Sequence, residues 1–309
     1  MAPIGDAGAN QEWERFRAGL FETELLIPTG VDGLYGGSER YESVVRALGD
    51  LIDRVGADQR ARVVRFPPVM PWANFVANGY LESFPDQMGS VHSFAGDQPQ
   101  HAELVRRAEH GEDRGPLLRA TDMVLRPAAC HPLYPTMSGV LPEEGCRVNV
   151  SGTCFRHEPS ADPFRMQVFR MHEYVYLGTP ERARDHRDEW LRRGIDTLSR
   201  LELPVEGTVA NDPFFGRPGR MLAANQRNEE LKFEIVTPVY ASERPTAIAS
   251  ANCHLDHFGR PFGIETARGD VAHSSCFGFG LDRIALALFN RHGTDPSSWP
   301  ETTRSVLWP

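Results

Sequence analysis

An arginine and a glutamate stand two residues apart at the start of a segment that begins Phe155-Arg156-His157-Glu158 and ends at Tyr174. Apolar residues on both sides of a charged, proline-bearing middle predict two antiparallel strands joined by a loop. Side chains two apart on a strand point to the same face, so Arg156 and Glu158 would lie together. Such a pair suits a nucleoside triphosphate, because the arginine can hold a phosphate while the glutamate accepts from the adenine amino group. A surface salt bridge on a hairpin is the alternative interpretation.

A second pattern of this type, Gly278-x-Gly280-x-x-Arg283, lies where a predicted strand passes into a helix. The glycines would allow close approach of the backbone to a ligand. Arg283 falls on the first helical turn, where its side chain would point back over that ligand. A tight turn followed by a surface arginine would look the same, so this pattern is weak when it stands alone.

Composition indicates one ordinary globular domain over residues 1–309, with 40% hydrophobic and 24% charged residues. The five cysteines are odd in number and scattered, which argues against a disulfide framework and favours a reducing, cytoplasmic setting. We find no signal peptide pattern and no apolar run of about 20 residues, the length that spans a bilayer. The formal net charge of −9 gives no general attraction for nucleic acid.

Apolar periodicity, with proline and glycine as boundaries, predicts alternating helices and strands. Ser38 and Thr179 are the expected N-caps of two long helices, and a glycine-rich loop is expected at 30–37. Helices are predicted at 12–25, 38–55, 74–84, 99–109, 179–203 and 281–289; strands are predicted at 61–69, 122–128, 148–155, 166–174, 231–239, 246–253 and 263–266.

Three patterns resemble motifs 1, 2 and 3 of the class II aminoacyl-tRNA synthetases. They are, in order, a helix followed by a strand that ends in proline, the FRxE sequence with its loop, and the GxGxxR sequence with its helix. The motifs fall at about 38–69, 148–176 and 274–290, with a helical insertion at about 179–203. The resemblance implies an α+β fold in which an antiparallel sheet of about six strands is flanked by helices. It also implies a homodimer and an ATP molecule bound on the sheet.

By that resemblance, Arg156 holds the α-phosphate of ATP and Glu158 the adenine amino group, Tyr174 stacks on adenine, and Arg165 and Arg283 hold the terminal phosphates. Gly278 and Gly280 leave room for the nucleotide. Magnesium accompanies ATP in this family, yet the predicted strand at 246–253 carries no carboxylate. The remaining weak candidates for its ligands are Glu234, Ser250 and Asn252.

Cys130, Glu173 and Cys276 are far apart in the sequence, but each stands beside a motif that the implied fold would bring to one pocket. Two thiolates and a carboxylate suit zinc and leave its fourth position open for substrate. Two buried thiols and an unrelated glutamate are the alternative. The archaeal-type seryl-tRNA synthetases resemble this pattern most, because a Cys–Glu–Cys zinc site there binds the amino group of the substrate.

The run Gly30-Val-Asp-Gly-Leu-Tyr-Gly36, together with this zinc pattern, resembles the amino acid:[carrier protein] ligases, which are truncated relatives of those synthetases. The expected activity is ATP-dependent activation of glycine, or of alanine, as an aminoacyl-adenylate. The aminoacyl group would then pass to the phosphopantetheine thiol of an acidic carrier protein. Asp212 and Asn252 are candidates for the amino-acid pocket; for Asp212, a turn-forming aspartate before proline is an equal alternative.

Only short segments lie before the helix at 38 and after residue 290, so no tRNA-binding domain and no tRNA partner are expected. Two other functions stay open: a minimal synthetase that charges tRNA in trans, and a non-catalytic paralogue that acts as a regulator. The arginines proposed to dock the carrier lie on the helix from Thr179 and in the loop after Asp212: Arg184, Arg187, Arg217 and Arg220.

Overall fold

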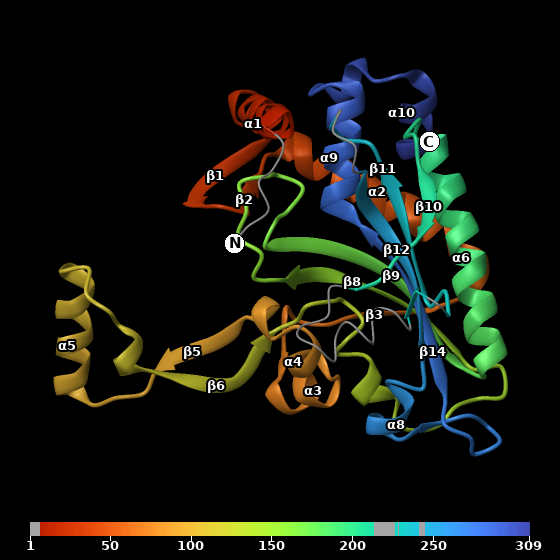
Figure 1. Ribbon diagram of the computed structural model, residues 1–309, viewed down its shortest axis with the longest axis horizontal. Coiled ribbons are helices and arrows are strands. Elements are labelled where there is room, and N and C mark those ends of the chain that lie inside the picture. The colour runs from red at the N-terminus through yellow and green to blue at the C-terminus, as the bar shows by residue number, and fades with distance from the viewer. Residues whose placement is uncertain (1–6, 213–225, 228, 241–244) are drawn as a thin grey trace.

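The computed structural model describes residues 7–212, 226–227, 229–240 and 245–309. A twisted sheet of seven strands runs through this part of the chain, in the order β10-β11-β12-β14-β9-β8-β3 (Figure 1). Neighbours pair antiparallel, except that β3 pairs parallel to β8. The expected six-stranded antiparallel sheet is therefore confirmed, and β3 extends it at one edge. The strands are β3 Arg62–Arg65, β8 Cys146–Phe155, β9 Val168–Gly178, β10 Glu206–Val209, β11 Lys232–Thr237, β12 Thr246–Leu255 and β14 His273–Gly280.

Helices cover one face of this sheet, which we call the back face (Figure 1). They are α2 Glu39–Val55, α6 Pro180–Arg200, α9 Leu281–His292 and α10 Glu301–Leu307. The predicted caps are present, since the side chains of Ser38 and Thr179 accept from backbone N–H groups in the first turns of α2 and α6. Trp190 of α6 is fully buried and stacks on Tyr174 of β9, with ring centroids 4.0 Å apart.

The opposite, front face of the sheet carries a second apolar cluster. Val148, Val150 and Val175 of β8 and β9 pack there against Tyr134 and Phe258, whose rings stack with centroids 3.8 Å apart. The short elements beside them are α8 Gly259–Phe262 and the parallel pair β7 Gly139–Val140 and β13 Ile264–Glu265. Period-2 alternation therefore decides which side chains of the central strands reach the front.

An arm extends from the sheet (Figure 1). It contains a three-stranded sheet in the order β4-β6-β5 and three helices. Val69 begins β4 directly after Pro67-Pro68, so the single strand predicted at 61–69 is divided into β3 and β4. The elements are β4 Val69–Pro71, α3 Trp72–Ala77, α4 Tyr80–Ser83, β5 Ser90–Phe94, α5 Gln98–Glu109 and β6 Leu118–Leu125.

The glycine-rich stretch predicted as a loop is instead a hairpin of β1 Leu26–Val31 and β2 Leu34–Gly37, preceded by α1 Ala7–Glu22. Gly33 in its turn has φ +77°, a conformation that glycine adopts without strain, and this allows the chain to reverse. Among the described residues, no helix combines the length and the apolar character that crossing a bilayer requires.

Candidate active site

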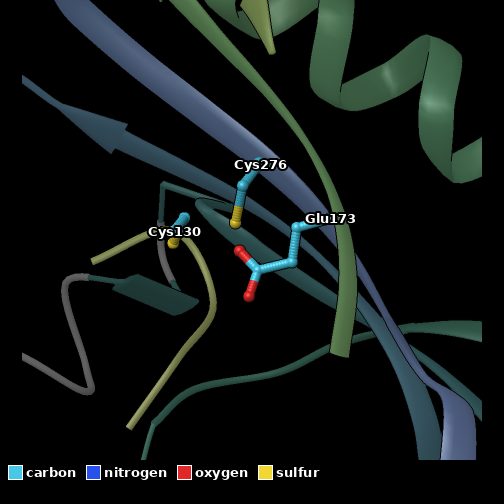
Figure 2. Close-up of side chains that lie close together, drawn as sticks. All are labelled: Cys130, Glu173 and Cys276. Atoms are coloured by element: carbon cyan, nitrogen blue, oxygen red, sulfur yellow. The ribbon is translucent and has the colours of Figure 1, made fainter. Parts of the chain in front are cut away.

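Cys130, Glu173 and Cys276 meet on the front face. Cys130 follows β6, Glu173 lies on β9 and Cys276 on the neighbouring strand β14. One ligand atom from each lies within 4.8 Å of the other two, and all three side chains are buried. Figure 2 shows the two sulfur atoms and the carboxylate directed toward one another from three separate elements. The structure thus brings together the three residues predicted to bind a metal.

The hydrogen bonds of Glu173 leave one oxygen available. Its Oε1 accepts from the backbone N–H of Ala129 at 2.8 Å, which fixes the carboxylate beside Cys130. Its Oε2 is buried without a hydrogen-bond partner among the described residues. A buried oxygen without a partner is costly, and a metal ion would satisfy it. This donor set fits a divalent ion such as zinc.

The protonation of the three groups is coupled. Burial and the neighbouring Cys276 sulfur raise the pKa of Glu173 to about 7. The Cys130 thiol donates to Cys276, which lowers the pKa of Cys276 and raises that of Cys130. Asn252 Nδ2 and His254 Nε2 each lie 3.5 Å from the Cys276 sulfur. These neighbours favour a thiolate at Cys276, the form that binds metals.

Glu173 should give the protein a pH-dependent stability in the presence of a metal chelator. The folded state keeps the carboxyl proton up to about pH 7, whereas the unfolded chain loses it near the ordinary pKa of 4.5. Between these values the folded state binds more protons, so the free energy of unfolding falls as pH rises, by about 3 kcal/mol in total. Urea unfolding at several pH values should show this slope in the wild type and lose it in Glu173→Gln. Equal slopes would contradict the assignment.

Arg156 and Glu158 lie just beyond the strand that was expected to carry them. β8 ends at Phe155, and the Glu158 N–H donates to the Arg156 carbonyl at 2.8 Å in a tight turn. The two residues are therefore brought together by this turn and not by strand alternation. Arg156 Nε donates to the Pro127 carbonyl at 3.1 Å, and its guanidinium lies 5.4 Å from the centre of the Phe169 ring.

Arg283 lies on the first turn of α9, as predicted. Its Nε donates to the Phe164 carbonyl and its Nη1 to the Ala247 carbonyl, both at 2.9 Å. Burial and the nearby charge of Arg156, with a smaller contribution from Arg165, lower the pKa of Arg283. Arg156, Arg165 and Arg283 thus lie in one region. In the described chain, backbone carbonyl oxygens accept the side-chain hydrogen bonds of Arg156 and Arg283. Such a cluster suits a polyphosphate.

Gly278 and Gly280 lie at closely packed points beside the cluster and Arg283. A Cβ atom at Gly278 would lie 3.0 Å from Met171 Cε and 3.5 Å from Glu173 Cγ. At Gly280 it would lie 3.1 Å from the carbonyl oxygen of Ile248. Any side chain at Gly278 would therefore press on Met171 and on Glu173 of the cysteine–glutamate cluster.

The structure contradicts the prediction that Tyr174 stacks on adenine. Its side chain is buried on the back face, where it stacks on Trp190 and its hydroxyl lies 3.0 Å from Asn149 Nδ2. Neighbouring residues of a strand face opposite sides, so Glu173 and Tyr174 cannot both reach the front. The aromatic residue of β9 that shares the face of Glu173 is Phe169, four positions earlier. The alternation was a signal in the sequence that could have identified Phe169.

The two candidates for the amino-acid pocket are placed near the cluster, together with a lysine that sequence reasoning missed. Asn252 of β12 pairs in register with Cys276, and Lys232 of β11 pairs with Asn252. Lys232 is buried and its Nζ forms ion pairs with Asp212 and Glu234. Lys232 helps to lower the pKa of Asp212 although burial opposes this, so Asp212 is a carboxylate. No local sequence motif marks Lys232.

Asp282 of motif 3 binds residues of both motif 1 and motif 2. Its carboxylate is buried and accepts from the Tyr41 hydroxyl of α2 at 3.0 Å and from Arg170 Nη2 of β9 at 2.6 Å. Arg170 also pairs with Glu42 of α2 at 2.5 Å. Asp282 immediately precedes Arg283, so this network fixes the first turn of α9 against the sheet and against α2.

Replacing Asp282 by asparagine should therefore lower the free energy of unfolding by about 2–4 kcal/mol, because a half-buried Arg170 loses the more deeply buried of its two carboxylate partners. Urea unfolding measures this loss. Asp53→Asn is the matched control: Asp53 also links α2 to β9, through His172, but it is half exposed and should cost about 1 kcal/mol. A loss at Asp282 no larger than at Asp53 would show that the network contributes little.

Comparison with known proteins identifies the family and the fold. No protein-family model matches the chain. Two curated relatives from Bradyrhizobium diazoefficiens, amino acid–[acyl-carrier-protein] ligases 1 and 2, are 43% and 41% identical over 92% of this chain, and the matches cover 87% and 85% of those proteins. The type-2 serine–tRNA ligase of Methanococcus aeolicus is 27% identical, and this chain spans about half of it, 52%.

Solved structures show the same fold. The M. kandleri SerRS chain in its crystal complex with A. aeolicus tRNASec superposes with a TM-score of 0.78, over 99% of this chain and 61% of that one, at 24% identity. A cytoplasmic serine–tRNA ligase from Naegleria fowleri gives 0.71 over 94% and 65%, at 13% identity. The class II synthetase fold is thereby confirmed. With 43% identity across most of both sequences, the chain belongs to the family of amino acid–[acyl-carrier-protein] ligases.

Proposed function

We propose that this ligase activates a small amino acid with ATP as an aminoacyl-adenylate and transfers it to the phosphopantetheine thiol of a carrier protein. One observation carries the proposal: the Cys130–Glu173–Cys276 cluster lies beside Gly278, five residues before Arg283, and the charge of Arg283 interacts with that of Arg156. We infer that a site for an amino group and a site for a triphosphate are adjacent.

Zinc is the ion that the cluster fits best, because two sulfur ligands and one carboxylate oxygen match its preference and leave one position for substrate. When bound, it would supply a Lewis-acidic position for the neutral amino group of the amino acid. Glu173 Oε2, which is buried and has no hydrogen-bond partner among the described residues, supports this assignment. Magnesium would be carried chiefly by the triphosphate, since Glu234 already pairs with Lys232.

Activation requires the amino-acid carboxylate in line with the α-phosphorus of ATP. A carboxylate oxygen forms a bond to that phosphorus while the bond to the leaving pyrophosphate breaks. Arg156 and Arg283 are placed to stabilise the charge on the phosphates, and their carbonyl partners hold the guanidinium groups in place beforehand. The ring of Phe169 under Arg156 offers a surface for adenine, and Glu158 an acceptor for its amino group.

Transfer needs no nucleophile from the protein. The thiol sulfur of the carrier attacks the carbonyl carbon of the adenylate, a thioester forms, and AMP leaves as the carbonyl–oxygen bond to its phosphate breaks. The thiol proton passes to solvent. Asp212, held charged by Lys232 and Gln226, and Asn252 are our proposed contacts for the amino end of the substrate. Glycine, then alanine, are the proposed substrates.

A homodimer and an acidic carrier are part of the proposal. Exposed apolar side chains on the edge strand β3 and in the arm, such as Val63 and Met123, support an interface there. The arginines of α6 are poorer docking candidates than the sequence indicated. The helix lies on the back face, away from Glu173, and Arg187 already contacts Asp188 and the Phe233 ring. Arg217 and Arg220 lie outside the described residues.

The test has two stages. Pyrophosphate exchange with each amino acid in turn, with and without a chelator, should give a chelator-sensitive signal for one small amino acid. The mass of a holo carrier protein should then increase by that aminoacyl group, while the apo carrier stays unchanged. Charging of total tRNA instead would indicate a synthetase acting in trans. Silence for every amino acid would refute activation and favour a regulatory paralogue.

A further inference from the structure

The turn of the β1–β2 hairpin touches the loop that joins β8 to β9 (Figure 1). The backbone N–H of Gln167 donates to the Gly33 carbonyl at 2.8 Å, and its side-chain Nε2 donates to the Asp32 carbonyl at 2.8 Å. Gln167 is buried. Two hydrogen bonds from one residue therefore fix the returning end of the loop to the hairpin turn.

The same residue reaches the arginines of the nucleotide site. The Gln167 carbonyl accepts from the backbone N–H of Arg156 at 2.9 Å. Phe164, three residues earlier in the loop, gives its carbonyl to Arg283 Nε at 2.9 Å. Arg165 lies between these two anchors, and its side chain is 62% exposed. Gln167 thus connects the turn directly to the backbone of Arg156, and Gln167 itself is two positions after Arg165 in the sequence.

Gly33 fits this junction closely. A Cβ atom there would lie 3.1 Å from the Arg165 carbonyl oxygen and 3.1 Å from the Gln167 nitrogen, so the loop would have to move by a few tenths of an ångström. Gly30, in the same hairpin, has a similar positive φ of +89°, but a Cβ atom there would meet nothing within 4 Å. Of these two glycines with positive φ, Gly33 is therefore in contact with the loop and Gly30 is free of it.

We propose that the Asp32–Gly33 turn is a positioning element of the nucleotide site and that Gln167 is the residue through which it acts. The turn holds the loop in the conformation that keeps Arg156, Arg165 and Arg283 directed at the triphosphate before ATP binds. Because a preset loop needs no ordering on binding, its loss should appear in the affinity for ATP. The proposal rests on ATP being a substrate, as proposed above.

Gly33→Ala against Gly30→Ala is the first test. Both place alanine at a positive φ and should lose similar thermal stability, but only Gly33→Ala displaces the loop. In pyrophosphate exchange we expect the KM for ATP to rise roughly fivefold in Gly33→Ala, with the KM for the amino acid unchanged, and both to stay at wild-type values in Gly30→Ala. An unchanged KM for ATP in Gly33→Ala, or an equal rise in both variants, would overturn the proposal.

If Gly33→Ala does not fold, Gln167→Glu tests whether the turn positions the nucleotide site. The substitution keeps the shape of the side chain but replaces the donor that binds the Asp32 carbonyl with an acceptor, so the KM for ATP should again rise selectively. If the wild type shows no exchange at all, the proposed function is wrong. Calorimetric titration of all four proteins with a non-hydrolysable ATP analogue would then still test the turn: weaker binding only in Gly33→Ala and Gln167→Glu supports it, and equal affinities refute it.

Discussion

Replacing Cys130 by serine is expected to remove the bound metal and to lower amino-acid-dependent pyrophosphate exchange by about a thousandfold or more. Loss of a residue that merely orients a metal ligand typically changes affinity or activity by roughly 10- to 100-fold, so loss of a ligand itself should cost more. Cys130 is one of only three ligands that the described residues offer, and its sulfur lies within 4.8 Å of the Glu173 oxygen and the Cys276 sulfur. A serine hydroxyl binds zinc poorly.

Cys154→Ser is the matched control. Cys154 is also buried in the front-face cluster, and its thiol donates to the Gly152 carbonyl, a contact that a hydroxyl can keep. The metal content of the purified proteins and the rate of exchange are the two measurements. Cys154→Ser should retain both, and Cys130→Ser should lose both together. Full metal content in Cys130→Ser, or retained exchange without metal, would remove the basis for amino-group binding at this cluster.

The order of the motifs allowed the central sheet and the Cys130–Glu173–Cys276 cluster to be predicted from the sequence. Each element carries its own local signal: the Ser38 cap, the prolines after β3, and the glycines before α9. The cluster followed because the implied fold places β9 beside β14, and the register pairs Glu173 with Gly278, two residues from Cys276. Local chemistry and strand order were sufficient here.

Interactions that depend on distant parts of the chain could not be predicted in the same way. Nothing near Lys232 in the sequence reveals that Asp212 lies beside it, and nothing near Asp282 reveals Tyr41, 241 positions away. The error at Tyr174 has a different origin. A residue next to a front-face ligand on a strand must face the back, so strand geometry alone excluded it. The hairpin at 26–37 was missed because a glycine-rich run gives little strand signal.

Replacing Arg156 by lysine is expected to reduce the exchange rate by roughly a hundredfold while the melting temperature changes little. Removing one donor that stabilises developing charge typically costs about 10²- to 10³-fold. The guanidinium of Arg156 donates through Nε to the Pro127 carbonyl and lies over the Phe169 ring, 5.4 Å from its centre. A lysine ammonium cannot keep the carbonyl contact, cover the ring and bind a phosphate at the same time.

Arg147→Lys separates this effect from the loss of any arginine that covers an aromatic ring. Arg147 lies near the start of β8, and its guanidinium is 5.5 Å from the centre of the Tyr176 ring, but it is exposed and lies at the opposite end of the strand from Arg156. It should leave exchange within about twofold of wild type, since an exposed cation–π pair contributes only about 0.5–1 kcal/mol to stability. Equal activity in Arg156→Lys and Arg147→Lys would show that Arg156 is not a phosphate ligand. In that case, Arg283 and Arg165 would have to hold the triphosphate without Arg156.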